Sequence, residues 1–166
     1  MKICFVLGTR PEIIKLFPLI KLCTDEKIQY FIIHTGQHYS YMMDKKFFLD
    51  FNIKPKYILN REKSFITSTI DKISPIFLRE KPDYIINQGD TNTVLASALA
   101  CNKLSLNMID NKKFKLVHVE SGLRSHDKSM PEEINRIIAD QLSDILLAPT
   151  PESQKNLIKE NISKKK

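Results

Sequence analysis

Residues 115–136 read KLVHVESGLRSHDKSMPEEINR and contain the densest group of ionisable side chains in the sequence. The apolar run that begins this segment predicts a buried strand over 115–119. Pro131 then suits the first turn of a helix. Acids, bases and a guanidinium therefore lie on the connection between a buried strand and a helix. In an open parallel sheet, this kind of connection is where ligands bind, outside the carboxyl ends of the strands.

Four glycines repeat the same pattern along the chain. Each follows an apolar run that predicts a strand, in the short sequences LGTR, TGQH, QGDT and ESGLR, at Gly8, Gly36, Gly89 and Gly122. A glycine permits a tight turn and a close approach of the backbone. Because the carboxyl ends of parallel strands meet at one edge of a sheet, we expect the four loops to lie together.

Strand patterns and helix patterns alternate through the whole sequence. Apolar runs predict strands over 3–7, 30–34, 84–87, 115–119 and 145–148, and apolar residues at helical spacing predict helices over 11–23, 44–51, 64–80, 94–101, 131–140 and 152–160. This alternation predicts the α/β class, with a doubly wound, Rossmann-like parallel sheet and right-handed crossovers. No interdomain linker is evident, so we expect residues 1–166 to form one domain.

Length and composition are those of an ordinary globular domain. The chain has 166 residues, of which 42% are hydrophobic and 27% are charged. Its formal net charge is +7, but the lysines are spread along the sequence and the aromatic side chains mostly lie in apolar runs. The sequence therefore predicts neither the basic stripe nor the stacking platform of a nucleic-acid-binding protein.

The cysteines and the apolar runs indicate the compartment of the protein and whether it carries a targeting segment. Cys4, Cys23 and Cys101 lie far apart and form no CxxC pair, which argues against a disulfide framework or a zinc site. A reducing compartment, and hence a cytoplasmic protein, is expected. The run over 3–7 is shorter than a signal-peptide core, and no other run approaches a membrane-spanning length, so no membrane partner is predicted.

The polar residues that follow the first two predicted strands have competing interpretations. The free N–H groups at the start of the first helix favour an anion, and Arg10 would add a charge suited to phosphate. Lys15 lies one turn beyond Pro11 on the same helix face. An arginine at a helix start is nevertheless often only solvated, and a loop histidine such as His38 is often only exposed.

The acidic residues later in the chain also have structural alternatives. Asp90 is placed to cap the helix that follows it. Ser129 lies three residues before Glu132, the spacing of a capping box. Glu133 is about 100° around the helix from Glu132, so only one of this pair is expected to face a cleft.

Five short motifs resemble a known family. In order, GTRPEIIKL, TGQH, QGDTNTVLA, HVESGLRS and MPEEINR are similar to the amino-terminal half of the non-hydrolysing UDP-N-acetylglucosamine 2-epimerases. The resemblance spans nearly the whole chain, from Met1 to about Ile162. It implies that the chain is one of the two Rossmann-like domains of a GT-B-like epimerase, with the active site in the cleft between the domains.

The resemblance also implies a role for each matching residue. The implied catalytic carboxylates are Asp90, Glu120 and Glu132, and the implied substrate-binding residues are Arg10, Lys15, Gln37, His38 and Arg124. In the family, UDP leaves C1 so that the C2 proton becomes removable, and UDP adds back with the proton returned to the opposite face. This chemistry needs carboxylates around the sugar and cations near the diphosphate. It requires no metal and no cofactor.

Two other functions remain open. The segment GLRSHDKSMPEEINR also resembles 2-epimerases that act on a UDP-diacetamido-uronic acid. The basic composition is compatible with a different class of protein, a non-catalytic anion-binding module.

The resemblance raises an expectation about a second domain. Family members continue into a carboxyl-terminal domain that holds most of the uridine and diphosphate contacts and a catalytic histidine, and they are expected to be homodimers when complete. This sequence ends in ENISKKK at the point where that domain should begin. We therefore expect residues 1–166 to need that domain in cis or in trans and to epimerise no UDP-sugar alone.

Overall fold

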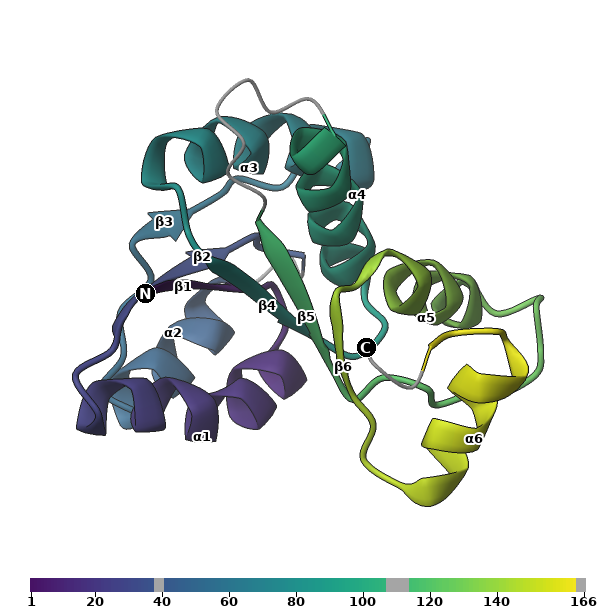
Figure 1. The fold of residues 1–166 in the computed structure, drawn as a ribbon. Coiled ribbons are helices and arrows are strands. Elements are labelled where there is room, and N and C mark those ends of the chain that lie inside the picture. Colours follow the sequence, from purple (N-terminus) through teal and green to yellow (C-terminus); the bar gives the residue numbers. More distant parts are fainter. Residues whose placement is uncertain (38–40, 107–113, 164–166) are drawn as a thin grey trace.

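A computed structural model of the chain describes residues 1–37, 41–106 and 114–163 (Figure 1). Its centre is a six-stranded sheet in which every recorded strand pair is parallel. The strands are β1 (Lys2–Leu7), β2 (Gln29–His34), β3 (Tyr57–Ile58), β4 (Tyr84–Gln88), β5 (Lys115–Val119) and β6 (Ile145–Leu147). The helices are α1 (Arg10–Asp25), α2 (Tyr41–Asp50), α3 (Phe65–Glu80), α4 (Asn92–Leu106), α5 (Pro131–Leu142) and α6 (Pro151–Lys159).

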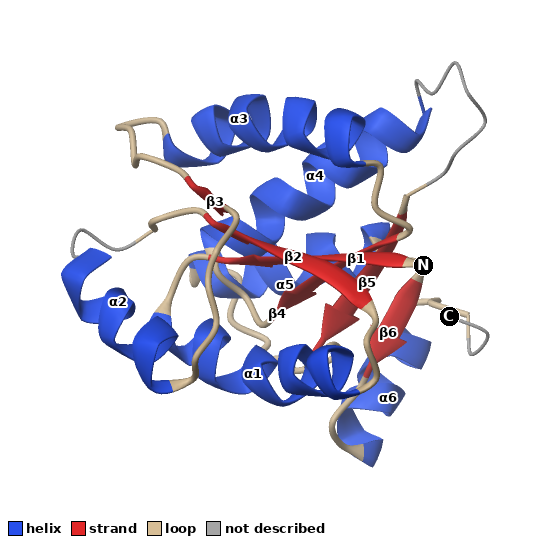
Figure 2. Ribbon diagram, turned by 90° about the vertical axis from the view of Figure 1, so that its left-hand side faces the viewer, coloured by secondary structure: helices blue, strands red, loops and turns tan. Residues whose placement is uncertain are grey.

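The strand order is β3-β2-β1-β4-β5-β6, so the chain first builds outward from β1 and then returns to continue on its other side with β4. This order is that of a doubly wound sheet, and its direction reverses between β1 and β4. Figure 2 shows α1 and α2 on one face of the sheet and α3 and α4 on the other. The predicted α/β fold class is confirmed.

Two apolar cores hold the three layers together. One packs side chains of α1 and α2, such as Leu16 and Phe48, against the sheet, and the other packs α3 and α4, through Phe77 and Ala98. Ala98 is fully buried, and the small residues of α4 let its backbone lie close to the sheet. Burial of the strands on both faces explains their unbroken apolar runs.

The predicted elements agree with the structure except at their ends and in one short strand. Each predicted helix and strand is present, and most extend one to five residues further than expected. The strand β3 was not predicted. It has only two residues, which pair with the end of β2 at Ile33 and His34, and two residues show no periodicity.

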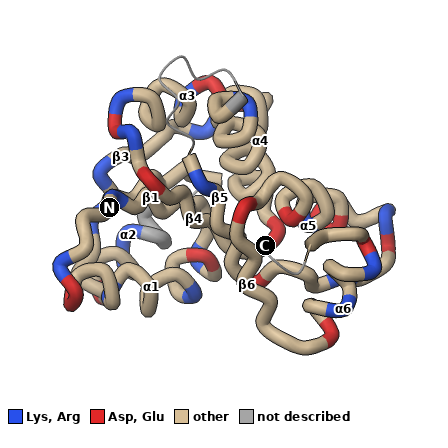
Figure 3. The backbone as a smooth tube through the Cα atoms, viewed as in Figure 1, with Lys and Arg blue, Asp and Glu red and all other residues tan. Residues whose placement is uncertain are grey.

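The structure also places the cysteines and the charged side chains. Cys4, Cys23 and Cys101 are buried. In the described part of the chain, no helix combines the length and apolarity needed to cross a membrane. Figure 3 shows Lys and Arg on α1, α3 and α6 with Asp or Glu close by, so the positive net charge is dispersed.

Candidate active site

A pocket of about 430 Å³ lies at the carboxyl ends of β1 and β4, where the strand order reverses. Its volume is within the range of small-molecule sites, and its position is the one expected for a ligand in a doubly wound sheet. It is lined by the loops after β1, β2 and β4 and by α5, through Thr9, Pro11, Glu12, Lys15, Gln37, Gln88, Gly89, Asp90, Thr91, Asn92, Pro131, Glu132 and Asn135.

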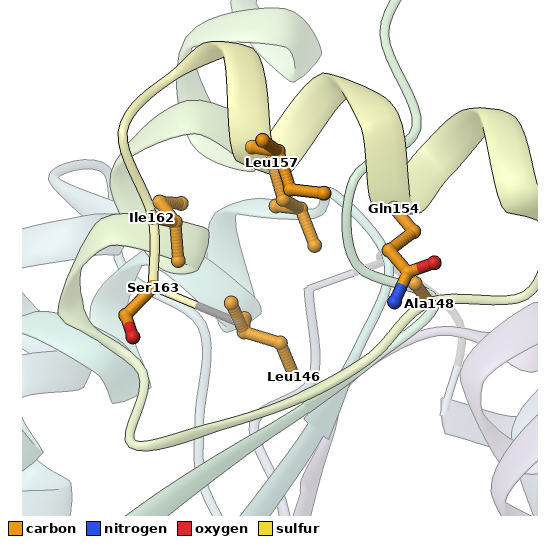
Figure 4. Close-up of a pocket in the computed structure, with 7 residues that line it drawn as sticks. Leu146, Ala148, Gln154, Leu157, Ile162 and Ser163 are labelled. Atoms are coloured by element: carbon orange, nitrogen blue, oxygen red, sulfur yellow. The ribbon is translucent and has the colours of Figure 1, made fainter. Parts of the chain in front are cut away.

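Two other hollows border β6 and differ from this pocket in chemistry. One is a cavity of about 90 Å³ between β6 and α6, where Leu146, Leu157 and Ile162 converge (Figure 4). The other is a shallow hollow along residues 146–154. No lining residue of either hollow is ionisable. We therefore place acid–base chemistry in the pocket at the carboxyl edge.

Glycines allow the loops at this edge to approach one another. All four follow the carboxyl end of a strand, as predicted. A Cβ atom on Gly8 would lie 2.1 Å from the hydroxyl oxygen of Thr35, so the loops after β1 and β2 touch there. Gly122 has a φ of +78°, and a Cβ on it would lie 2.3 Å from the carbonyl oxygen of Ser153. Side chains at these two positions would push the loops apart.

Glu120 is held toward α1. The ammonium of Lys15 lies 2.6 Å from its Oε2, and the amide of Gln88 donates to the same oxygen. The backbone of Glu120 has a φ of 69°, in the left-handed region that is costly for residues other than glycine. Glu120 is not itself part of the pocket lining, but both of these partners are.

Asp90 is held by α5. Its carboxylate is paired with the guanidinium of Arg136, and its carbonyl accepts a hydrogen bond of 2.8 Å from Asn135 Nδ2. Asp90 does not cap α4, because the N–H of Val94 donates instead to the hydroxyl of Thr91. The capping alternative for Asp90 is therefore wrong, and its carboxylate side chain lines the pocket.

The two adjacent glutamates of α5 differ in exposure and in hydrogen bonding. Glu132 lines the pocket, is exposed, and within the described residues has no recorded hydrogen bond or ion pair. Glu133 is only 1% exposed and accepts the N–H groups of Ser125 and His126. Burial opposes its ionisation, but these N–H groups and the Arg136 guanidinium lower its pKa to about 2. The expectation that one of the pair faces the cleft is confirmed.

The expected capping box of α5 is absent. The helix is preceded by Met130, which has no side-chain capping hydrogen bond, and the Ser129 hydroxyl donates to Asp127 instead. The Asp127 side chain accepts this bond and the N–H of Ser129, so the loop closes on itself. Glu132 is consequently not used as a capping residue.

Glu12 corrects the expectation about the start of α1. Its Oε2 accepts the N–H groups of Gly8 and Thr9, each at 2.8 Å, and its Oε1 accepts the hydroxyl of Thr91 at 2.7 Å. These two N–H groups are therefore not free to bind an anion. Burial raises the pKa of Glu12 to about 7 despite its three hydrogen bonds. The T-x-x-E spacing of Thr9 and Glu12 was a signal that could have predicted this.

The remaining predicted residues occupy different places. Gln37 lines the pocket, and its Oε1 accepts the N–H and hydroxyl of Thr93 at 2.9 and 3.0 Å. Arg10 is exposed at the first residue of α1 and is not part of the pocket lining. His38 lies outside the described residues.

Arg124 is placed differently from the expectation. Its side chain is 1% exposed, and its guanidinium contacts Asp140 at 2.7 Å and both carboxylate oxygens of Glu160 at 2.6 Å. Arg124 is therefore bonded within the fold, and it is not among the residues that line the pocket. A loop arginine can pair with its own protein as readily as with a substrate.

Sequence comparison assigns the family. The profile of the family described as UDP-N-acetylglucosamine 2-epimerase matches residues 20–166. The chain belongs to this epimerase family. It is 47% identical over 171 residues to the UDP-N-acetylglucosamine 2-epimerase of Methanocaldococcus jannaschii, in a match that covers 100% of this chain and 44% of the relative.

Two further comparisons relate this member of the family to known proteins. The crystal structure of the Methanocaldococcus jannaschii enzyme in complex with UDP-GlcNAc and UDP superposes with a TM-score of 0.89 at 47% identity, over 98% of this chain and 44% of that one. The UDP-2,3-diacetamido-2,3-dideoxy-D-glucuronate 2-epimerase of Pseudomonas aeruginosa is 38% identical, over 99% of this chain and 46% of the relative. The chain thus spans less than half the length of these relatives.

Four residues of this epimerase chain that organise the site were not singled out from the sequence. Asn135 and Arg136 hold Asp90, and His118 and Asp140 form a buried pair beneath the loops. Asn135 and Arg136 belong to the quoted motif MPEEINR, which was the signal available for them.

Proposed function

We propose that this chain supplies the acid–base side of a UDP-N-acetylglucosamine 2-epimerase. One observation carries the proposal: among the carboxylates of the family motifs, Asp90 and Glu132 line one pocket, and Glu120 contacts Lys15 and Gln88, which line it too. Lys15 lines the same pocket and supplies a cation there.

The reaction moves one proton and one leaving group. UDP departs from C1 with the electron pair of the C1–O bond, and a carboxylate takes the proton from C2, which leaves a C1–C2 double bond. UDP then attacks C1, and C2 receives a proton on its other face. Acid and base groups are therefore needed on both sides of the sugar, together with cations for the departing diphosphate.

The three carboxylates differ in their contacts, and these contacts suggest different roles. Asp90 and Glu120 are each held in orientation by a cation. Glu132 has no recorded partner among the described residues and is exposed to the pocket, so it is the group free to exchange a proton. Lys15 and Arg10 approach the diphosphate, and Gln37 and His38 contact the nucleotide sugar. Arg124 is left out because its guanidinium is buried.

The proposal includes a second domain. The residues that line the pocket all come from one edge of the sheet and from the helix starts beside it, so one side of a bound sugar would face water. Elimination needs a closed site that orients the diphosphate and protects the intermediate. The isolated chain is therefore inactive and works with a carboxyl-terminal domain in cis or in trans, in a homodimer. The three buried thiols support a reducing, cytoplasmic location.

Deuterium exchange tests the activity. The chain is incubated with UDP-N-acetylglucosamine in heavy water, with and without a separately made carboxyl-terminal domain of a full-length relative, and deuterium at C2 is followed. Exchange only with the added domain is expected, and exchange by the isolated chain on the order of 1 per second or faster would contradict the inactivity of the chain. No exchange under either condition, with the complex shown to form, would contradict the proposed function.

A second substrate is supported by the 38% identity to the diacetamido-glucuronate enzyme. The same exchange assay with that UDP-uronic acid decides between the two sugars. Because the identity to the UDP-N-acetylglucosamine enzyme is higher, at 47%, we expect faster exchange with UDP-N-acetylglucosamine. A clear preference for the uronic acid would replace the substrate and leave the reaction class unchanged.

A further inference from the structure

A fully buried histidine lies beneath the candidate active site. His118, on β5, and Asp140, on α5, are both 0% exposed, and His118 Nδ1 lies 2.6 Å from Asp140 Oδ1. The other ring nitrogen, Nε2, lies 2.7 Å from the carbonyl oxygen of Gly89, the residue before Asp90. A buried chain of contacts therefore runs from α5 through β5 to the loop that carries a proposed catalytic carboxylate.

The partners decide where the ring carries hydrogen. A carbonyl oxygen only accepts, so Nε2 must donate to Gly89. Asp140 uses its other oxygen, Oδ2, to accept the N–H of Gly122 at 3.0 Å and to pair with Arg124 at 2.7 Å, and the guanidinium favours the ionised carboxylate. An ionised carboxylate also only accepts, so Nδ1 must donate as well.

Gly89 needs this contact more than another residue would. It has a φ of +80° and no side chain, and a Cβ built there would meet nothing within 4 Å. Its N–H donates to the carbonyl of Val119 at 3.1 Å, and its own carbonyl faces His118. Glycine has more backbone freedom than other residues, so these two bonds matter more here. The bond from His118 fixes the carbonyl of Gly89, and Asn135 fixes the next carbonyl, that of Asp90.

We propose that His118, held by Asp140 with a hydrogen on both ring nitrogens, is a positioning residue that fixes the Gly89–Asp90 peptide and so aims Asp90 into the pocket. Asp140 also binds the N–H of Gly122, two residues after Glu120, so one buried carboxylate ties together both loops that carry a paired carboxylate. The catalytic part of this inference rests on the proposed function. The assignment of the two hydrogens does not.

Nitrogen NMR tests the assignment without any substitution. In the chain labelled with ¹⁵N-histidine at pH 7.5, both ring nitrogens of His118 are expected to resonate as protonated nitrogens. The exposed His126 gives a comparison within the same spectrum. A ring with hydrogen on only one nitrogen would overturn the proposal.

Two substitutions around Arg124 provide a matched pair. Asp140→Asn removes the charge that faces His118, and its amide can donate to Nδ1, so the ring is expected to lose one hydrogen. Glu160→Gln removes a charge from the same guanidinium and does not touch His118, so the ring is expected to keep both. Retention of both hydrogens in Asp140→Asn would show that Asp140 does not hold the ring, and would overturn the proposal.

The same pair tests positioning in the epimerase assembled with its carboxyl-terminal domain. Asp140→Asn is expected to lower kcat for C2 exchange by about 10- to 100-fold and leave KM for UDP-N-acetylglucosamine within about twofold, because the substrate still binds and Asp90 is misdirected. Glu160→Gln is expected to change kcat by less than about threefold. Equal losses in the two variants, or a rise in KM alone, would overturn the positioning role. If the assembled wild-type enzyme shows no exchange, the proposed function fails, and the nitrogen spectra still decide the state of His118.

Discussion

Ionisable side chains lie at both edges of the sheet, but the two groups differ in how far their charges are paired within the fold. At the amino edge, where the strands begin, one carboxylate gathers several partners. Glu80 is contacted by the ammonium groups of Lys2 at 2.5 Å and Lys56 at 2.7 Å and by the hydroxyl of Tyr57, and its side chain is 9% exposed. The bonds from Lys2, Lys56 and Tyr57 lower its pKa to about 2. The Glu80 carboxylate is thus fully engaged by partners within the fold.

At the carboxyl edge the carboxylates are spread around a cavity. Asp90 and Glu120 each have one cation, Glu12 is buried under hydrogen bonds, and Glu132 has no recorded partner among the described residues. Charge density alone therefore does not distinguish a site from a structural brace. A cavity next to a carboxylate that the fold leaves unpaired makes the distinction.

The largest expected effect compares Glu132 with Glu80. In the assembled epimerase, Glu132→Gln is expected to lower the rate of C2 exchange by about 1000-fold, because it removes a group that exchanges a proton. Its thermal midpoint should stay within about 2 °C of wild type, since the side chain is exposed and has no recorded partner. Glu80→Gln is the control, and exchange at the wild-type rate is expected for its folded fraction. A comparable loss of exchange in both variants would remove the distinction between the edges.

The second largest effect is the loss of stability when a glycine at the carboxyl edge is replaced. Gly122→Ala is expected to destabilise the chain by about 3 kcal/mol or more, because it combines a left-handed backbone with a contact of 2.3 Å to the Ser153 carbonyl. Gly89→Ala has the same backbone demand and open space around it, so about 1 kcal/mol is expected. Urea unfolding of the two variants measures the difference. Equal losses would show that the close approach at Gly122 is not tight.

A smaller effect is the pH dependence that Glu12, at the carboxyl edge, adds to the free energy of unfolding. Its pKa is raised to about 7, so its contribution to stability is present below about pH 4.5 and is lost as pH rises through 7. Between pH 5 and 8, wild type should therefore lose about 2 kcal/mol more stability than Glu12→Gln. Parallel unfolding curves at pH 5, 6.5 and 8 test this. Identical pH slopes in the two proteins would show that Glu12 is ionised throughout.

The smallest effect has the opposite sign and belongs to the amino edge. Because the pKa of Glu80 is lowered to about 2, its contribution is present above about pH 4.5 and is lost as pH falls toward 2. Glu80→Gln should lower stability by about 1 kcal/mol at pH 7, since its partners are partly exposed and screened. At pH 2 the two proteins should unfold alike. A difference that persists unchanged at pH 2 would exclude the ionised network as its source.

The sequence predicts the layout of the carboxyl edge because buried parallel strands are unbroken apolar runs. The ends of those runs locate Gly8, Gly89 and Gly122, and a shared edge follows from parallel topology. Asp90 and Glu120 could be placed beside one another for that reason alone. The direction of their side chains depends on tertiary partners, and no local pattern encodes these.

The residues that were misplaced or missed share that limitation. Arg124 pairs with Glu160, which lies 36 residues later, and no spacing rule connects them. Asp140 lies at a polar position of an amphipathic helix, where solvent exposure is the ordinary expectation, yet it is fully buried against His118. Glu12 was different, because its capping-box spacing from Thr9 was visible in the sequence.

The central claim is that the pocket at the carboxyl edge binds the UDP-sugar, and backbone NMR tests it most directly. A ¹⁵N-labelled chain is titrated with UDP-N-acetylglucosamine, with N-acetylglucosamine as the control. Amide shifts are expected in the loops after β1, β2 and β4 and at the start of α5, with residues such as Gly8, Gln37 and Asp90 among the most affected. The amides of Lys2, Tyr57 and Glu80 at the opposite edge should stay unchanged. Shifts that concentrate at the amino edge, or in the hollows beside β6, would contradict the account.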